Sequence, residues 1–231
     1  MSAGTQAFTP PRRTSYVGPP LLAPALAHVT LFVASLFVGI LSGVFSRPTT
    51  PAREVAVSVA AHADALSVVA VLQVGAAVAL GVFTASVVAA LRSRGVRVAG
   101  VEIARFGGYA ASLLLMLSGL CGWAMSQLAG AVDADAVKAL SLLAFATGGP
   151  GHVVVLGLLL AGVSVPSFIL RLVPRWVSVL GLALAGIAVL SVLSLVVTPL
   201  QVLLPLARFP ALVWVVAVAA TLLPNNHGSR R

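Results

Sequence analysis

Three long apolar runs fill most of residues 148–224, and they constrain the fold of this chain more than any other feature. Two short segments separate the runs, one at 171–176 and one at 198–201. An apolar run of about 18 residues or more with few charges is typical of a transmembrane helix. The stretch therefore predicts that the chain crosses a membrane several times.

The composition indicates the same class of protein. Of the 231 residues, 60% are hydrophobic and 8% are charged, whereas about 25% of the residues of an average soluble domain are charged. A chain with so few charges needs lipid around most of its surface, so we expect the lipid bilayer as its partner. The net charge of +9 does not indicate nucleic-acid binding, because the basic residues lie in short gaps between apolar runs rather than on one basic face.

We predict an all-α polytopic membrane protein, a six-transmembrane-helix bundle with short loops. The six spans are expected at residues 21–46, 66–91, 103–128, 151–170, 177–197 and 205–223. Residues 1–20 and 225–231 are predicted to be tails outside the membrane. Gly39 and Gly43 have the GxxxG spacing that lets helices approach closely, which leaves a helix-mediated homo-oligomer open.

Two stretches do not fit a simple span. A helix from Pro51 to Leu91 would have 41 residues and a length of roughly 60 Å, about twice the thickness of the hydrocarbon core. Its charged first part, residues 51–64, is therefore expected to stand outside the core or to be separated by a break. Residues 138–147 are apolar but too short to span, so they predict a short interfacial helix that Gly148-Gly149-Pro150 ends.

Two side-chain contacts are predicted, one in the fourth span and one at the start of the third. Pro166 removes one backbone hydrogen bond inside the fourth span, and Ser164 and Ser167 are expected to help satisfy the freed carbonyl group. Glu102 and Arg105 are three residues apart at the start of the third span, so they are expected to form an ion pair.

The distribution of basic residues predicts the orientation. Six spans place both chain ends on one side, and that side holds ten basic residues against four on the other. The ten are Arg12, Arg13, Arg92, Arg94, Arg97, Arg105, Arg171, Arg175, Arg230 and Arg231, and the four are Arg47, Arg53, Lys138 and Arg208. Because loops rich in arginine and lysine stay in the cytoplasm, both termini are predicted to be cytoplasmic.

Polar side chains near the outer ends of the spans are the candidate site, because polar groups inside a membrane are costly and often functional. These residues are predicted to line an outward-facing pocket: His62, Asp64, Gln73, Gln127, His152, Gln201 and Arg208. His62 and Gln73 are eleven residues apart, which is close to three helical turns, so they are expected to point the same way. Arg208 is expected near the outer start of the sixth span.

Three interpretations of these residues are open. In the first they are structural, with Gln73 bonded to a neighbouring helix and Arg208 reaching the headgroups or pairing with Asp64. In the second, Gln73, His152 and Arg208 contact a small solute, for instance an anionic one, in a transport or solute-binding pocket. In the third, His62 and His152 hold haem or a metal ion. His28 is expected on the wrong side of the membrane to join that pair.

No motif in the sequence indicates an enzyme. The chain contains no HExxH pattern and no GxSxG elbow, and Gly148–Gly151 lacks the lysine and the preceding strand of a phosphate loop. Cys121 is the single cysteine, so it forms no intramolecular disulfide and fits no metal-ligand spacing. We therefore expect a non-enzyme, and the sequence predicts no cofactor.

Several segments of the C-terminal half carry a resemblance to a known family. They are Gly151-His152, Leu172–Trp176, the glycine-rich fifth span and Leu204–Pro210. Through them, residues 140–224 resemble small six-span bacterial membrane proteins of the family called domain of unknown function 4386, and the first three spans are similar in layout. The family has no established activity, so no catalytic residue is carried over. The resemblance implies a six-helix bundle in a bacterial cytoplasmic membrane.

Overall fold

The structure is a computed structural model that describes residues 20–130 and 133–222. The predicted tails lie outside these ranges, apart from Pro20. Its helical elements are α1 (Leu22–Ser42), α2 (Ala52–Ala61), α3 (Ala63–Ser93), α4 (Ala99–Gln127), α5 (Ala134–Ala146), the π-helical segment η1 (Thr147–Gly151), α6 (His152–Leu170), α7 (Arg175–Leu190), the 3-10 helices η2 (Ser191–Leu195) and η3 (Thr198–Val202), and α8 (Leu203–Thr221).

Six helical stretches are long and apolar enough to cross a membrane, which confirms the predicted all-α, six-span class. They are Leu22–Ser42, Ala63–Ser93, Ala99–Gln127, Ala134–Leu170, Arg175–Leu195 and Thr198–Thr221. Each overlaps one predicted span, but most boundaries differ by a few residues and the fourth begins 17 residues earlier than predicted. The fifth stretch is α7 followed by the 3-10 helix η2, and the sixth is the 3-10 helix η3 followed by α8.

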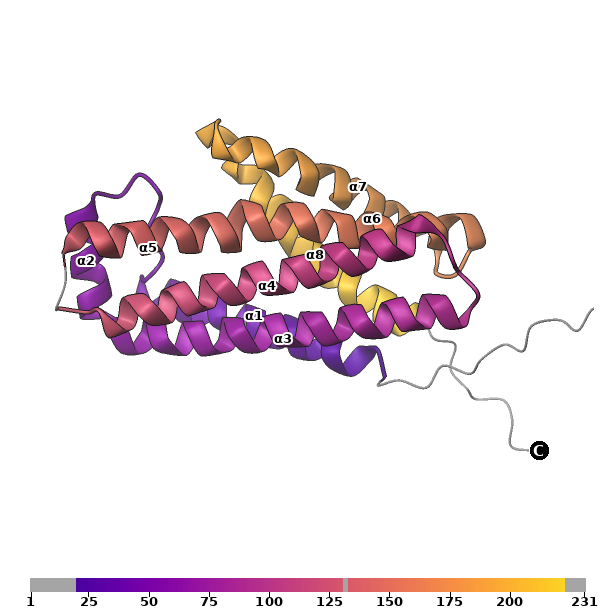
Figure 1. Cartoon of the computed structure of the whole chain (residues 1–231), viewed down its shortest axis with the longest axis horizontal. Coiled ribbons are helices and arrows are strands. Elements are labelled where there is room, and N and C mark those ends of the chain that lie inside the picture. The colour runs from indigo at the N-terminus through magenta and orange to yellow at the C-terminus, as the bar shows by residue number, and fades with distance from the viewer. Residues whose placement is uncertain (1–19, 131–132, 223–231) are drawn as a thin grey trace, which may run out of the picture.

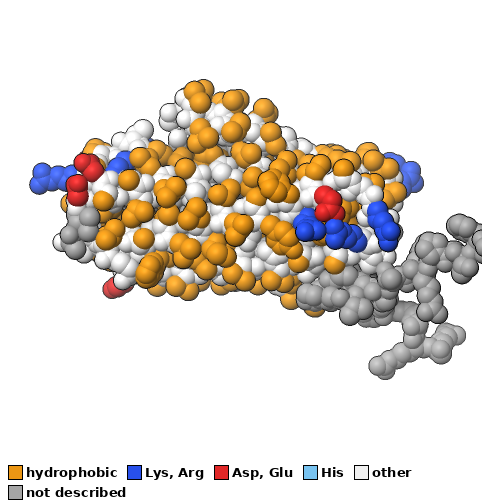
Figure 2. Space-filling model, viewed as in Figure 1, with side chains coloured by type: hydrophobic (Ala, Val, Ile, Leu, Met, Phe, Trp, Pro, Cys, Tyr) orange, Lys and Arg blue, Asp and Glu red, His pale blue; other side chains and the backbone are white. Residues whose placement is uncertain are grey.

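The six stretches run back and forth along the long axis of the molecule (Figure 1). We call one end the α2 end, because α2 and the start of α5 lie there with Glu54, Asp64 and Asp133. We call the other the arginine end. It carries Arg92, Arg94, Arg97, Arg105, Arg171 and Arg175. Hydrophobic side chains are spread over the visible face between the ends, and the charged side chains gather toward the ends (Figure 2), as a lipid-facing surface requires.

Small residues bring α3, α4 and α6 into close contact. Ser112 on α4 donates to the Ala77 carbonyl on α3 over 2.6 Å, and a Cβ on Gly81 would lie 3.1 Å from the Ser112 Oγ. On the other side of α4, a Cβ on Gly107 would lie 2.6 Å from the backbone nitrogen of Leu159 on α6. In lipid the hydrophobic effect does not drive helices together, because the surrounding chains are as apolar as the helices. Close van der Waals contact between backbones is therefore a main source of stability for the bundle.

Among the described residues, the nearest neighbour of Gly39 is in the loop after α1 and not on another helix. A Cβ on Gly39 would overlap the ring of Phe45, which follows in the same loop. Gly43 ends α1 in the left-handed conformation with φ 66°, a backbone angle that glycine adopts at no steric cost. The two glycines therefore shape the end of α1.

The helix predicted to start at Pro51 is broken, as the length of the stretch required. α2 ends at Ala61, and His62 leaves the helical conformation with φ −132° and ψ 30° before α3 begins. His62 is exposed at this break, and its Nδ1 lies within hydrogen-bond distance of the Ser58 carbonyl of α2. That His62 and Gln73 point the same way stays a prediction. Helical periodicity holds only within one uninterrupted helix.

Gly148-Gly149-Pro150 interrupts the helix where the sequence predicts a break, but the interruption is a kink between α5 and α6 and not the end of a separate short helix. α5, η1 and α6 form one 37-residue helical stretch, with a length of about 55 Å. The chain passes Pro150 through a π-helical turn in which Gly149 alone has non-helical angles, φ −89° and ψ −106°. The kink at Gly149 thus joins α5 to α6 without a loop between them.

Two side-chain predictions have opposite outcomes. The predicted pair is present, with Arg105 Nη1 3.6 Å from Glu102 Oε2. Ser164 and Ser167 lie beside Pro166 in α6, but neither hydroxyl has a hydrogen-bond partner among the described residues. They therefore do not satisfy the carbonyl group that Pro166 frees.

The contact between α4 and α6 gives a test of this packing. In Gly107→Ala the new methyl group meets backbone atoms of α6 at 2.6–2.7 Å, so the helices must move apart, and overpacking of this kind costs about 1–3 kcal/mol. We expect a lower melting temperature in mild detergent. Gly186→Ala is the control, because nothing lies within 4 Å of its new Cβ. Equal melting temperatures for both variants would contradict the contact.

Candidate functional site

A large cavity opens at the α2 end, and we call it the α2-end pocket. Its volume is about 600 Å³, and it lies among α1 and its following loop, α2, α3, α4, α5, η1, η3 and α8. Phe45, Pro205 and Phe209 in its wall are exposed, so the cavity is open to the surroundings. Most of the lining is apolar, for example Val55, Leu66 and Met125. The polar side chains in it are Ser46, Arg47, Gln73, Ser118, Ser141, Gln201 and Arg208.

The structure brings together three of the seven candidate residues in this pocket, namely Gln73, Gln201 and Arg208. His152 lies next to it but lines a different cavity. The other three, His62, Asp64 and Gln127, are exposed at the α2 end and do not line the pocket. The Nδ1 of His62 is 3.0 Å from the Ser58 carbonyl, within the same turn of chain.

Among the described residues in the wall of the pocket, Arg208 is the only charged one that lies deep in a span, as the eleventh of 24 residues in the stretch Thr198–Thr221. It donates to the carbonyl of Gly148 and lies 3.5 Å from that of Gly149. Its guanidinium carbon lies 5.5 Å from the centre of the Phe32 ring, a cation–π contact. Its Nε has no partner among the described residues.

This geometry differs from both structural roles expected for Arg208. The described ion pairs are those of Glu102 with Arg92 and with Arg105, so Asp64 does not pair with Arg208. The side chain turns inward to η1 instead of outward to the headgroups. The interrupted helix at η1 supplies carbonyl groups for it, which is how irregular backbone and buried cations satisfy each other inside membranes.

A second, much smaller cavity lies on the other side of Arg208, and we call it the histidine cavity. Its volume of about 10 Å³ is close to the minimum for one water molecule. Its lining comprises His28, Phe32, His152, Leu156, Arg208, Ala211, Leu212 and Val215. Arg208 is the one residue that lines both cavities. Its side chain therefore separates them.

The two histidines of this cavity tie helices together. The Nδ1 of His28 in α1 is 2.9 Å from the Ala76 carbonyl of α3, and the Nδ1 of His152 in α6 is 2.9 Å from the Ala111 carbonyl of α4. A carbonyl oxygen only accepts, so each Nδ1 carries a proton, and in the neutral ring Nε2 is then an acceptor. Both side chains are almost fully buried, at 3% and 2% exposure.

The expectation that His28 lies on the wrong side to join His152 is therefore wrong, and His62 is not the partner. His152 is the nineteenth of 37 residues in the continuous stretch Ala134–Leu170, which places it at mid-depth rather than at an outer edge. His28, Phe32 and Ser35 are three or four residues apart and lie on the buried face of α1, and this spacing was the sequence signal for that face. It did not reveal what that face meets.

The geometry does not fit the haem or metal interpretation. His62 is exposed at the α2 end, whereas His152 is enclosed in a cavity with room for about one water molecule. The described residues contain no group of three or more His, Cys, Asp or Glu side chains placed to hold a metal ion.

Comparisons of the chain with protein-family models, with curated proteins and with solved structures find no match. The resemblance of residues 140–224 to domain of unknown function 4386 thus stays a prediction.

Arg208→Ala should lower the stability of the protein, because it leaves the Gly148 carbonyl without its charged donor. A hydrogen bond to a charged group is worth about 1.5–3 kcal/mol, and we expect a loss in that range from melting curves in mild detergent. Arg175→Ala is the matched control, since Arg175 is exposed at the first turn of α7. A loss of the same size in the control would contradict the role assigned to Arg208.

An absorption spectrum tests the haem interpretation directly. We expect the protein purified in mild detergent to show no Soret band and no stoichiometric metal, because the histidine cavity is too small for a macrocycle. A Soret band that disappears in His28→Ala or His152→Ala would overturn this reading of the site.

Proposed function

We propose that this chain is a multi-pass protein of the bacterial cytoplasmic membrane that binds or transports a small solute, and that it is not an enzyme. The solute would enter the α2-end pocket and carry an anionic group next to an apolar part. The observation that carries this proposal is the position of Arg208 in the wall of a large, mostly apolar pocket.

The charge of the pocket supports an anionic solute. Arg47 and Arg208 both line it, and no acidic side chain occurs among its described lining residues. A guanidinium group matches the planar geometry of a carboxylate or phosphate and can bind it through two parallel hydrogen bonds. The Nε of Arg208 is buried and has no partner among the described residues, so it would become a donor for such an anion only when the side chain moves toward the pocket. The apolar majority of the lining suits a hydrocarbon part of the solute.

The amides of Gln73 and Gln201 would orient the solute. They come from α3 and η3, so they lie on separate elements of the wall. An amide offers both donors and an acceptor, and Gln73 makes no hydrogen bond to another described residue. Its polar group is thus available to a ligand.

The position of Arg208 between the two cavities supports transport in addition to binding. An anion that draws the guanidinium group away from Gly148 would also open the wall of the histidine cavity, because the same side chain lines both. Arg208 would then have two arrangements, one bound to Gly148 and one bound to the anion. The solute shifts the balance between them only to the extent that it binds one arrangement more tightly than the other.

The sidedness of the proposal rests on the charges. Six arginines lie at the arginine end, and Arg47, Arg53 and Lys138 are the basic residues at the α2 end among those described. By the positive-inside rule the arginine end is cytoplasmic, so the α2-end pocket faces outward and both termini are cytoplasmic.

Gln73→Leu tests the proposed site without disturbing the bundle. We expect a loss of binding, because the leucine cannot hydrogen-bond the solute, with little change in the melting temperature of the free protein. Binding is measured as the thermal shift caused by medium-chain carboxylates such as octanoate. Gln127→Leu is the matched control, since Gln127 is exposed outside the pocket.

The outcomes separate a solute pocket from structural polar residues. Loss of the thermal shift in Gln73→Leu alone supports the proposal. Equal loss of stability and binding in this variant, or no loss of either, would instead favour a purely structural role for Gln73.

A further inference from the structure

A second large hollow lies at the arginine end, and we call it the arginine groove. Its volume is about 970 Å³, and it lies among the end of α3, the connection that follows it and the first part of α4. It shares no lining residue with the α2-end pocket or the histidine cavity. Its lining comprises Ala85, Val88, Ala89, Arg92, Ser93, Val96, Arg97, Val98, Ala99, Val101, Glu102, Arg105 and Tyr109.

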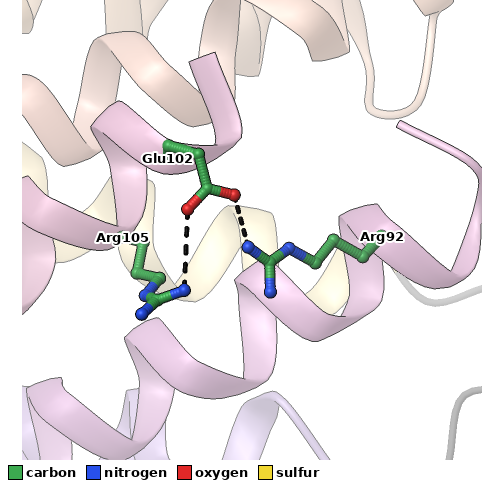
Figure 3. Close-up of polar contacts among 3 residues, drawn as sticks. All are labelled: Arg92, Glu102 and Arg105. Carbon is green, nitrogen blue, oxygen red and sulfur yellow. Dashed lines mark hydrogen bonds and ion pairs between the residues drawn. The ribbon is translucent and has the colours of Figure 1, made fainter. Parts of the chain in front are cut away.

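Glu102 holds two arginines of the groove side by side (Figure 3). One of its carboxylate oxygens accepts from Arg92 of α3, and the other lies 3.6 Å from Nη1 of Arg105 of α4. One carboxylate faces three guanidinium groups when Arg97 is included, so the groove keeps a net charge of about +2 at neutral pH. Each guanidinium group has five N–H donors, and the carboxylate occupies only a fraction of them.

The groove changes from charged to apolar along the bundle. Tyr109 follows Arg105 by four residues, which is about 6 Å along the helix, and tyrosine is enriched at the level of the lipid headgroups. On α3, Ala85 and Ala89 are exposed small residues that precede Arg92. Ala77, Gly81, Ala85 and Ala89 follow one another every four residues on α3, and the first two of these small residues pack on α4. Ala85 and Ala89 instead line the open groove.

We propose that the arginine groove binds an anionic phospholipid, with the phosphate group among Arg92, Arg97 and Arg105 and an acyl chain along Ala85, Ala89 and Tyr109. The side chains of Arg92 and Arg105 are 46% and 51% exposed, so water screens their attraction for a small free anion. A phospholipid adds the burial of its chain against the apolar lining, which stabilises the complex in proportion to area. Basic pockets of this kind at the cytoplasmic side of a membrane suit anionic headgroups.

The melting temperature in mild detergent tests the proposal. Phosphatidylglycerol should raise it more than phosphatidylcholine with the same acyl chains, because only the former carries net negative charge. Arg92→Gln/Arg105→Gln should lose this difference. The matched control is Arg171→Gln/Arg175→Gln, which removes the same charge at the same end of the molecule but outside the groove, and it should keep the difference.

Three further arms make the result decisive. Melting in phosphatidylcholine alone shows that each variant is folded, and Arg97→Gln, which leaves the Glu102 ion pairs intact, should weaken the lipid effect by itself. Inorganic phosphate should give no shift. A full shift with inorganic phosphate, equal shifts with the two lipids, or the same loss in the Arg171→Gln/Arg175→Gln control would overturn the proposal. None of these measurements involves the α2-end pocket, so they stand or fall independently of the proposed solute.

Discussion

The positive charge of Arg208 at mid-span constrains the surrounding structure more than any other group. A charged side chain surrounded by hydrocarbon costs several kcal/mol or more unless protein groups satisfy it. The carbonyl of Gly148 accepts from it, and the ring of Phe32 lies beneath it. One side chain thus joins α8 to η1 and to α1, which are far apart in the sequence. The acceptor belongs to η1, the π-helical turn at which the helical stretch is kinked.

Small residues allow the helices to pack closely enough for Arg208 to contact η1. A Cβ on Gly148 would overlap the Ser118 side chain of α4, and Ser118 donates to the Ala144 carbonyl just before η1 over 2.9 Å. Close packing of α4 against η1 therefore fixes the turn that meets Arg208. The same approach of α3, α4 and α6 brings the Ala76 and Ala111 carbonyls to the two buried histidines. Polar contacts in this bundle thus depend on glycine, alanine and serine at the helix contacts.

The two groups of arginines differ in their surroundings, and this difference separates their proposed roles. Arg208 is shielded between two cavities, where few groups compete for an incoming anion and an electrostatic contact is strong. Arg92 and Arg105 lie about half exposed at the end of the bundle, where each ion pair contributes little to stability. Arg208 is therefore suited to selecting a solute. Arg92 and Arg105 are suited to contact with a charged membrane surface.

The sequence by itself determined the class of the protein, its six spans and the Glu102–Arg105 pair. It also required residues 51–64 either to stand outside the membrane core or to be separated by a break. These features follow from hydrophobicity, helix length and spacing along one helix, all of which are local. The contact of Arg208 with η1, the meeting of His28 and His152, and the pocket at Gln73 and Gln201 were decided by the tertiary structure. They depend on how deep each residue lies in its span and on which helices pack beside it. For His152 that depth follows from the kinked junction at η1, which joins α5 to α6 in one stretch. A residue's depth and its neighbours on other helices are set by packing, which no single helical period encodes.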